Sequence, residues 1–222
     1  RQVFIKGLIG AMCVDQINNK YLERVLNNAS GNDENELDEL GYTDMEHDLD
    51  EAFGNLYGVW DFLDPDAMTG KLLDKHLDKV NLYYPGIANA IYDAFIIARH
   101  SIVIDDFETR DFQIGVIKSL INKVVIHQAI NYLVLSADML NEDIPISENG
   151  MFFHYLSKAY GFIFSLQFTD YFNTNQIENL MNEMMEGNGF WDITVSDINN
   201  IIDFIITSSG YDYYEEIAYQ DL

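Results

Sequence analysis

The sequence contains a single cysteine, Cys13, and only three prolines among its 222 residues. One cysteine excludes an internal disulfide and the thiolate clusters of structural zinc sites. Because Cys13 lies in an apolar run with helical spacing, we expect a small core residue rather than a reactive thiol. No apolar run approaches the ~20 residues that a helix needs to cross a bilayer, so no transmembrane segment is expected.

Basic residues are also scarce, with 12 Lys and Arg against 37 Asp and Glu, and the formal net charge is −25. Such a charge disfavours nucleic acid and anionic membrane surfaces as partners, because both are polyanions. It favours a solvated acidic surface, with cations as the alternative partners. The 48% hydrophobic content suffices for a substantial core in one domain or two small ones.

Motifs of the common enzyme classes are missing as well. The sequence has no Gly-x-Ser-x-Gly, no P-loop and no Gly-x-Gly-x-x-Gly. Cys13 is far in sequence from any histidine, and three further histidines have no partner at a suggestive spacing: His76, His100 and His127. We therefore expect a protein that is not an enzyme.

Helical periodicity dominates what is present, and the alternation typical of strands is rare. The pattern predicts an all-α helical bundle with helices over residues 2–27, 43–60, 85–104, 109–140, 147–167, 174–186 and 195–208, and a short one near 70–80. Expected helix-capping residues are Thr43, Ser147, Thr174 and Ser196. Pro85 stands where a first helical turn tolerates proline.

Two octets of the chain, "HDLDEAFG" at 47–54 and "HYLSKAYG" at 154–161, share one frame. Similar pairs flank them in the same order: "QINNKYL" with "QAINYL", and "IANAIYDAFII" with "INNIIDFII". Chance similarity between amphipathic helices is the alternative for any single pair. Three pairs in one order favour an internal duplication, with pseudo-repeats over 1–105 and 106–222.

Counting at about 100° per residue places the same back face on both octet helices. The faces consist of His47, Glu51, Gly54 and Gly58 in the first helix, and of His154, Lys158, Gly161 and Ser165 in the second. Small residues four apart permit close backbone approach. We expect the two back faces to form a packing interface, with Glu51 and Lys158 as an ion pair. A solvent-facing role for the glycines is the alternative.

Polar residues also interrupt the predicted apolar stripes. Asp15 and Asn18 share a stripe with Phe4, Leu8 and Ala11, and Gln128 and Asn131 lie on or beside the stripe of the 109–140 helix. Buried polar groups need partners, since an unmet one costs ~1–3 kcal/mol. The four residues therefore predict either an interhelical hydrogen-bond network or a ligand-binding pocket.

A metal site is conceivable at the first octet. His47 and Glu51 share a helix face, and Asp50 adds a carboxylate beside them. The Glu-x-x-His element of dinuclear carboxylate bundles is missing, and the acidic segment 33–44 lacks the residue order of a calcium loop. Iron and calcium are the candidate ions for His47, Asp50 and Glu51, and no other cofactor is expected.

Together with the octets, the runs "YTDMEHDLDEAFG" (42–54), "LSKAYGFIFSL" (156–166) and "VSDINNIIDFI" resemble an uncharacterised, imelysin-like domain family of bacterial cell-envelope lipoproteins. The resemblance covers nearly the whole chain. It implies a fold of two related helical bundles, export, and a place in the periplasm or at the outer membrane of a Gram-negative cell. It also implies a full protein that extends beyond Arg1.

Imelysins carry a Gly-x-His-x-x-Glu hallmark and are linked to iron uptake. Here Met45 replaces the glycine and Asp50 takes the place of the glutamate. The leading hypothesis is a non-enzymatic envelope protein with a ligand-binding or accessory role in iron or haem acquisition. The alternative is a structural subunit that docks onto an outer-membrane transporter or assembly complex. An exposed aromatic patch at 211–219, "YDYYEEIAY", would favour docking.

Overall fold

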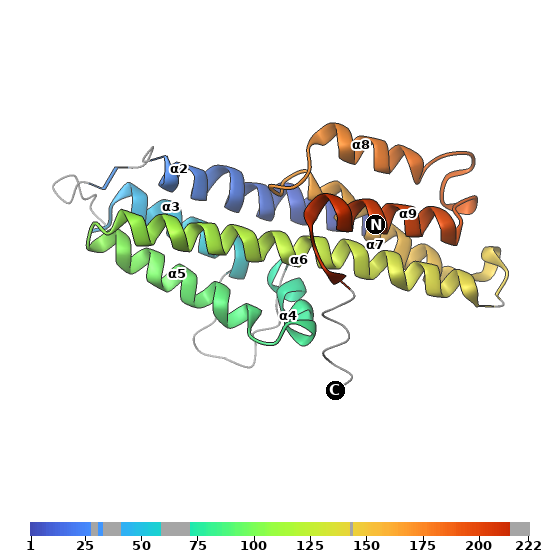
Figure 1. The fold of residues 1–222 in the computed structure, drawn as a ribbon, viewed down its shortest axis with the longest axis horizontal. Coiled ribbons are helices and arrows are strands. Elements are labelled where there is room, and N and C mark those ends of the chain that lie inside the picture. Colours follow the sequence, from blue (N-terminus) through green and yellow to red (C-terminus); the bar gives the residue numbers. More distant parts are fainter. Residues whose placement is uncertain (28–30, 33–40, 59–71, 143, 214–222) are drawn as a thin grey trace. The chain divides into compact units, whose positions relative to one another are not determined.

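A computed structural model describes residues 1–27, 31–32, 41–58, 72–142 and 144–213, and every regular element in these ranges is helical (Figure 1). The expectation of an all-α protein is confirmed. The α-helices are α1 (Gln2–Ile9), α2 (Leu22–Leu26), α3 (Asp44–Tyr57), α4 (Asp74–Tyr83), α5 (Ile87–Val103), α6 (Phe107–Asn141), α7 (Gly150–Leu166), α8 (Thr174–Glu183) and α9 (Val195–Ser209). Short 3-10 turns lie at Ile146–Glu148 and Gly189–Trp191. Among these described helices, none is both long enough and apolar enough to span a membrane.

The chain forms two compact units. The central unit comprises residues 12–121, and the terminal unit combines residues 1–11 with 122–222. Both units share the long helix α6, which gives its first half to the central unit and its second half to the terminal one. The boundary expected from the sequence, between residues 105 and 106, comes just before α6, whereas the compact units divide within it.

In the central unit, α3 packs against α2, the segment Gln16–Tyr21 and α5, and α4 packs against α5. The apolar spacing of α3 explains this arrangement, because one stripe of the helix is buried while Asp44 and Asp50 stay exposed. The core side chains include Val14, Ile17, Leu22, Met45, Leu49, Ala52, Leu56, Leu77, Ile91, Phe95 and Ile102.

In the terminal unit, α7 packs against α1 along most of the length of α1, and against α8. Its core is formed by Ile9, Ile126, Ile130, Leu133, Phe152, Leu156, Ala159, Phe162, Ile163, Ile177, Ile198 and Ile202, among others. In both octets, the leucine at the third position and the alanine at the sixth are fully buried.

The first helix departs from the prediction of one α-helix over 2–27. Between α1 and α2, residues Gly10–Val14 and Gln16–Tyr21 are π-helical, with the wider i→i+5 hydrogen bonding. The wider turn changes which residues share a face, so a stripe counted at 100° per residue fails here. Phe4 is 69% exposed, and the buried positions include Ile9, Cys13, Val14 and Ile17, which lie off the expected stripe.

Helix starts follow local hydrogen bonding. Thr43 caps α3 as expected, and it forms a capping box with Glu46. The other three expected caps are wrong: the side chains that accept the first-turn N–H groups belong to Asn149, Asn173 and Thr194 rather than to Ser147, Thr174 and Ser196. Each observed cap lies one or two residues away in the sequence from the cap that was expected.

Candidate functional site

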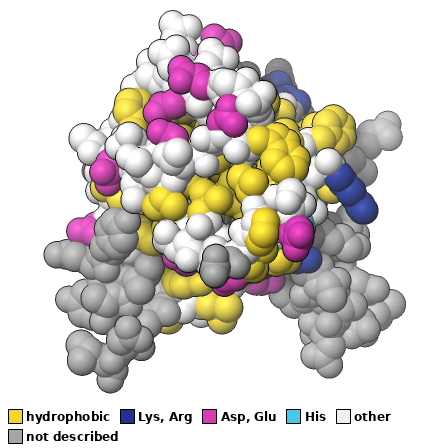
Figure 2. Space-filling view, turned by 90° about the vertical axis from the view of Figure 1, so that its right-hand side faces the viewer, with side chains coloured by type: hydrophobic (Ala, Val, Ile, Leu, Met, Phe, Trp, Pro, Cys, Tyr) yellow, Lys and Arg dark blue, Asp and Glu magenta, His cyan; other side chains and the backbone are white. Residues whose placement is uncertain are grey.

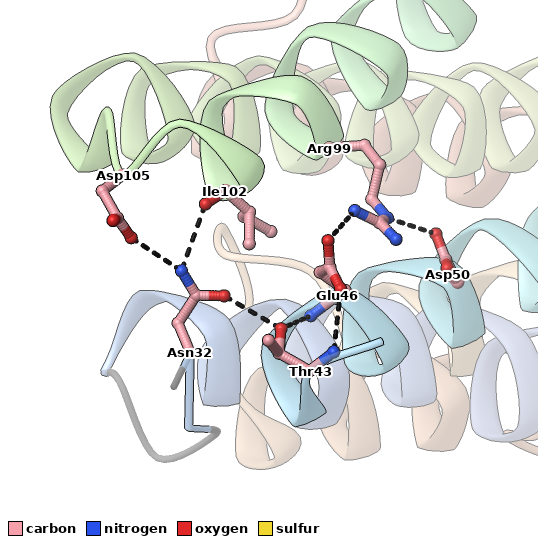
Figure 3. A network of polar contacts seen from close by, with 7 residues as sticks. All are labelled: Asn32, Thr43, Glu46, Asp50, Arg99, Ile102 and Asp105. Carbon is pink, nitrogen blue, oxygen red and sulfur yellow. Dashed lines mark hydrogen bonds and ion pairs between the residues drawn. The ribbon is translucent and has the colours of Figure 1, made fainter. Parts of the chain in front are cut away.

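The first octet helix, α3, is held by arginines from the helices beside it. Arg24 Nε donates to Asp48 Oδ2 at 2.8 Å from the α2 side. Arg99 of α5 pairs with Glu46 through Nη1 and with Asp50 Oδ1 through Nε at 3.2 Å (Figure 3). Partial burial raises the pKa of Asp50, and the Arg99 charge opposes that rise. Asp48 and Asp50 of the octet, with Glu46 just before it, therefore fix α3 between α2 and α5.

A chain of hydrogen bonds continues this contact to the end of α5 (Figure 3). Thr43 Oγ1 donates to Asn32 Oδ1 at 2.9 Å, and Asn32 Nδ2 donates to the carbonyl of Ile102 and to Asp105 Oδ1. Glu46 Oε2 accepts from the Thr43 amide at 2.8 Å. Asp105 has a positive φ of 56°, an unfavourable backbone conformation that the Asn32 contact stabilises.

Two of the three predicted metal ligands lie near each other. His47 Nε2 is 3.8 Å from Glu51 Oε1, and the His47 ring stacks on Tyr42. Both side chains are nearly half exposed. Asp50 instead faces Arg99. Across the described ranges, no three His, Cys, Asp or Glu side chains come together in a way that could hold a metal ion.

The second octet helix, α7, uses its small residues to receive α1. A Cβ added at Gly161 would lie 2.6 Å from the Lys6 Cβ and 2.8 Å from the Val3 carbonyl oxygen. Ser165 Oγ donates to the Lys6 carbonyl at 3.0 Å. A Cβ at Gly10 would collide with Ser165. Gly161 and Ser165 thus contact α1. The sequence pattern had predicted that they would contact the back face of the first octet helix.

The corresponding glycines of the first octet helix are exposed. A Cβ added at Gly54 would meet no described atom within 4 Å. Gly58 is the C-cap of α3, with a φ of 73° that favours glycine. Among the described residues, these two positions therefore have no packing partner like that of Gly161. The expected contact of Glu51 with Lys158 stays a prediction.

An apolar groove opens on the terminal unit between α1, α7 and α8. Its volume is about 310 Å³, and its lining consists of Val3, Phe4, Gly7, Leu8, Ala11, Tyr160, Phe164 and Met181. The tyrosine hydroxyl is the single polar side-chain group in that lining. The expected core stripe of the first helix is therefore wrong for Phe4, Leu8 and Ala11, which face the groove. Sequence periodicity marks such residues as apolar but cannot tell a core from an open groove.

A second hollow, of about 240 Å³, lies at the α8–α9 connection and is acidic. Figure 2 shows acidic side chains beside exposed hydrophobic ones on the face that contains this connection. Two of its carboxylates serve the local backbone: Asp192 Oδ2 accepts from the Asn188 amide, and Asp197 closes the capping box of Thr194. These two carboxylates of the hollow therefore stabilise the turn that leads into α9.

The four polar residues proposed as ligand-binding are divided equally between the units. Asp15 is part-exposed and accepts a hydrogen bond from Asn19 at 3.0 Å, whereas Asn18 is fully buried. Gln128 is fully buried on α6, and Asn131 accepts from the Tyr213 hydroxyl at 3.4 Å. The interhelical network and the pocket both stay predictions.

Sequence reasoning missed a buried contact around His127. Its Nδ1 lies 2.8 Å from the Tyr211 hydroxyl, and its ring packs 5.3 Å from that of Tyr213. Burial, and then the charge of Lys123, lower the pKa of His127 to about 4. Burial also raises the pKa of Tyr211. The pair anchors residues 211–213 to α6, and the rest of the predicted aromatic patch, 214–219, lies outside the described residues.

Comparison with known proteins gives one family. Residues 1–211 match a family described as "Domain of unknown function (DUF4856)". No curated protein and no solved structure matched the chain. The match covers nearly the entire chain, including both octets and the groove.

Proposed function

Because the chain belongs to the DUF4856 family, whose function is unknown, we propose a role from its geometry: a non-enzymatic docking protein that binds an amphipathic helix of a partner. The observation that carries this proposal is the open apolar groove between α1, α7 and α8. Grooves between helices that are lined by apolar side chains commonly receive the apolar face of another helix.

Exposure of the groove supports binding to a partner. Phe4 is the most exposed of its aromatic side chains, at 69%. Exposed apolar surface of this kind is unfavourable in water, since burial gains ~25 cal/mol per Å². The close crossing at Gly161 holds α1 in place, so the wall formed by α1 is already ordered before binding.

The charge of the chain indicates the chemistry of the partner. With a net charge of −25, the protein attracts basic surfaces and repels acidic ones. Two glutamates of α8, Glu178 and Glu183, stand on the helix that forms one groove wall. The proposed partner helix is therefore apolar on one face and basic on its flanks.

Fluorescence anisotropy with a defined probe tests this proposal. The probe is a labelled peptide of leucine and lysine, roughly five helical turns long, with its leucines on one face. We expect saturable binding that Phe4→Glu weakens at least about tenfold, because the change places a charge in an apolar contact. A scrambled peptide of the same charge should bind weakly.

The matched control is Phe112→Glu, which introduces the same charge at a phenylalanine that is 68% exposed on α6, outside the groove. This variant should bind like the unaltered protein. Binding that Phe4→Glu leaves unweakened, as in Phe112→Glu, would mean that the attraction is only electrostatic, since added negative charge does not weaken the attraction of a basic peptide, and the groove proposal would be abandoned.

The place of action is proposed from the resemblance to imelysin-like envelope lipoproteins. We place the protein in the periplasm or at the outer membrane, with a transporter or assembly complex as the partner. The internal duplication is a further proposal, which the equal burial of Leu49 and Ala52 and of Leu156 and Ala159 supports. Cell fractionation with a specific antibody tests the location.

A second candidate function is an accessory role in iron or haem acquisition, with iron or calcium held at the first octet. The observation that favours it is the exposed pair of His47 and Glu51, two ligand-type side chains 3.8 Å apart. Elemental analysis of protein purified from its native source tests it. Near-stoichiometric metal that is lost on His47→Ala would support this role, and a metal-free protein would count against it.

A further inference from the structure

The second octet helix carries basic side chains in a chain that has few. Lys158 Nζ lies 4.9 Å from the centroid of the Tyr132 ring of α6 and 5.6 Å from that of the Tyr155 ring. The two rings stack on each other with an interplanar angle of 23°. This ammonium group therefore stands above an aromatic surface formed by two helices.

Two more basic residues lie beside Lys158. His154, Lys158 and Gly161 follow each other at spacings of four and three, which is one face of α7. Lys6 reaches that face because α1 crosses α7 at Gly161, against the Lys6 Cβ. The pKa of His154 is lowered by partial burial and then by the charges of Lys158 and Lys6, as expected for an imidazole close to two lysines.

The basic cluster is separate from the apolar groove. Gly7 of α1 lies at the crossing, and steps of about 100° per residue place Phe4 and Leu8 on one side of it. The same count places Lys6 on the other side. The groove and the cluster therefore occupy opposite flanks of the α1–α7 contact.

We propose that Lys6, His154 and Lys158 form a binding site for a phosphate-type oxyanion, in which the rings of Tyr132 and Tyr155 hold the Lys158 ammonium group in place. Lysine ammonium groups bind phosphate as point charges, and an imidazole N–H supplies a directed donor. Because the net charge of −25 repels anions, a local group of basic side chains is needed to bind one. Free phosphate and the phosphate of a lipid headgroup share this chemistry.

The experiment is a titration of the full chain with inorganic phosphate, followed through the His154 ring resonances in NMR spectra. We expect saturable shifts and a rise in the pKa of His154, since a bound anion favours the imidazolium form. Lys158→Gln should weaken binding by about tenfold or more, and Lys158→Arg should restore most of it.

The matched control is Lys20→Gln, which removes another lysine that lies over a tyrosine ring, Tyr21, in the central unit. It should leave phosphate binding unchanged. A second titration uses vesicles of phosphatidylglycerol or of phosphatidylcholine. Binding to phosphatidylglycerol alone that requires Lys158 would identify a headgroup as the source of the phosphate, whereas saturation by inorganic phosphate alone would identify a free anion.

Three results would overturn the proposal. One is the lack of a saturable response at His154 in both titrations. Another is an equal loss of binding in Lys20→Gln and Lys158→Gln. The third is vesicle binding that persists unchanged in the folded Lys158→Gln variant, because such binding would arise elsewhere on the molecule.

Discussion

The two octet glycines provide the sharpest test of the packing, because the same substitution should have opposite effects at the two positions. Gly161→Ala places a Cβ within 2.6 Å of the Lys6 Cβ and 2.8 Å of the Val3 carbonyl oxygen. Since backbone atoms are among these neighbours, α1 has to move away. Gly54→Ala meets no described atom within 4 Å, in an exposed part of α3.

The magnitudes follow from two opposing contributions to the free energy of unfolding. Replacing glycine by alanine inside a helix gains ~1 kcal/mol of helix propensity at both positions. Overpacking at Gly161 costs ~1–3 kcal/mol, and contacts below 3 Å place it in the upper part of that range. We therefore expect Gly161→Ala to destabilise the protein by ~1–2 kcal/mol and Gly54→Ala to stabilise it by up to ~1 kcal/mol.

Urea unfolding followed by far-UV circular dichroism measures both changes through the transition midpoint. The difference between the two variants, ~2–3 kcal/mol, is the decisive quantity, because the propensity gain cancels in it. A neutral or stabilising Gly161→Ala would refute the close crossing of α1 over α7. A destabilising Gly54→Ala would instead support the packing interface that the sequence analysis expected at the first octet.

Three further predictions concern charged and titrating groups. Lowering the pH from 6.5 to 4 should reduce the free energy of unfolding by ~3 kcal/mol through His127, because this residue binds a proton in the unfolded chain while its folded pKa is about 4. Acid unfolding curves should show the same loss in Tyr211→Phe and no such loss in His127→Gln. Asp74→Asn should stabilise the protein by ~1–3 kcal/mol at pH 7.5 and have no effect at pH 3.5, because burial and then Asp78 raise the pKa of Asp74 to about 6 and favour its neutral form. Equal urea midpoints of the variant and the unaltered protein at pH 7.5 would contradict this. Arg99→Gln should cost ~1–2 kcal/mol in urea unfolding, because it separates α5 from Glu46 and Asp50 of α3, and an unchanged midpoint would show that the ion pairs are not stabilising.

Much of the fold could be predicted from periodicity, since helices such as α3, α5 and α9 bury one stripe each. The first helix could not be predicted in this way. Its π-helical segments shift the buried face, and no residue between positions 10 and 21 signals that change. Phe4 and Leu8 were assigned to a core by counting, whereas they line the groove.

The octets show where motif reasoning succeeds and where it stops. The second octet glycine, Gly161, and Ser165, one turn further along α7, do lie at a close helix crossing, but their partners are Gly7 of α1 and Gly10 directly after α1. In the first octet, Asp50, one of the carboxylates that suggested a metal site, is a partner of Arg99, which also pairs with Glu46 just before the octet. Single-sequence patterns contain no information on which helix supplies such a partner from 49 or 53 residues away.

The contact around His127 illustrates the same limit. A tyrosine 84 residues further along the chain completes it, and the spacing of neither residue indicates the pair. Only the capping glycine at position 210, with a φ of 65°, marks the point where the chain turns back toward α6.

The most direct test of the proposed docking role is NMR of the methionine methyl groups during titration with the amphipathic leucine–lysine peptide. Met181 lines the groove, and Met151, which is 50% exposed in the same unit, lies outside it. The proposal predicts a saturable shift of the Met181 methyl resonance, an unchanged Met151 resonance, and loss of the Met181 shift in Phe4→Glu. Peptide binding that leaves Met181 unshifted would contradict it, because the partner would then bind at another surface.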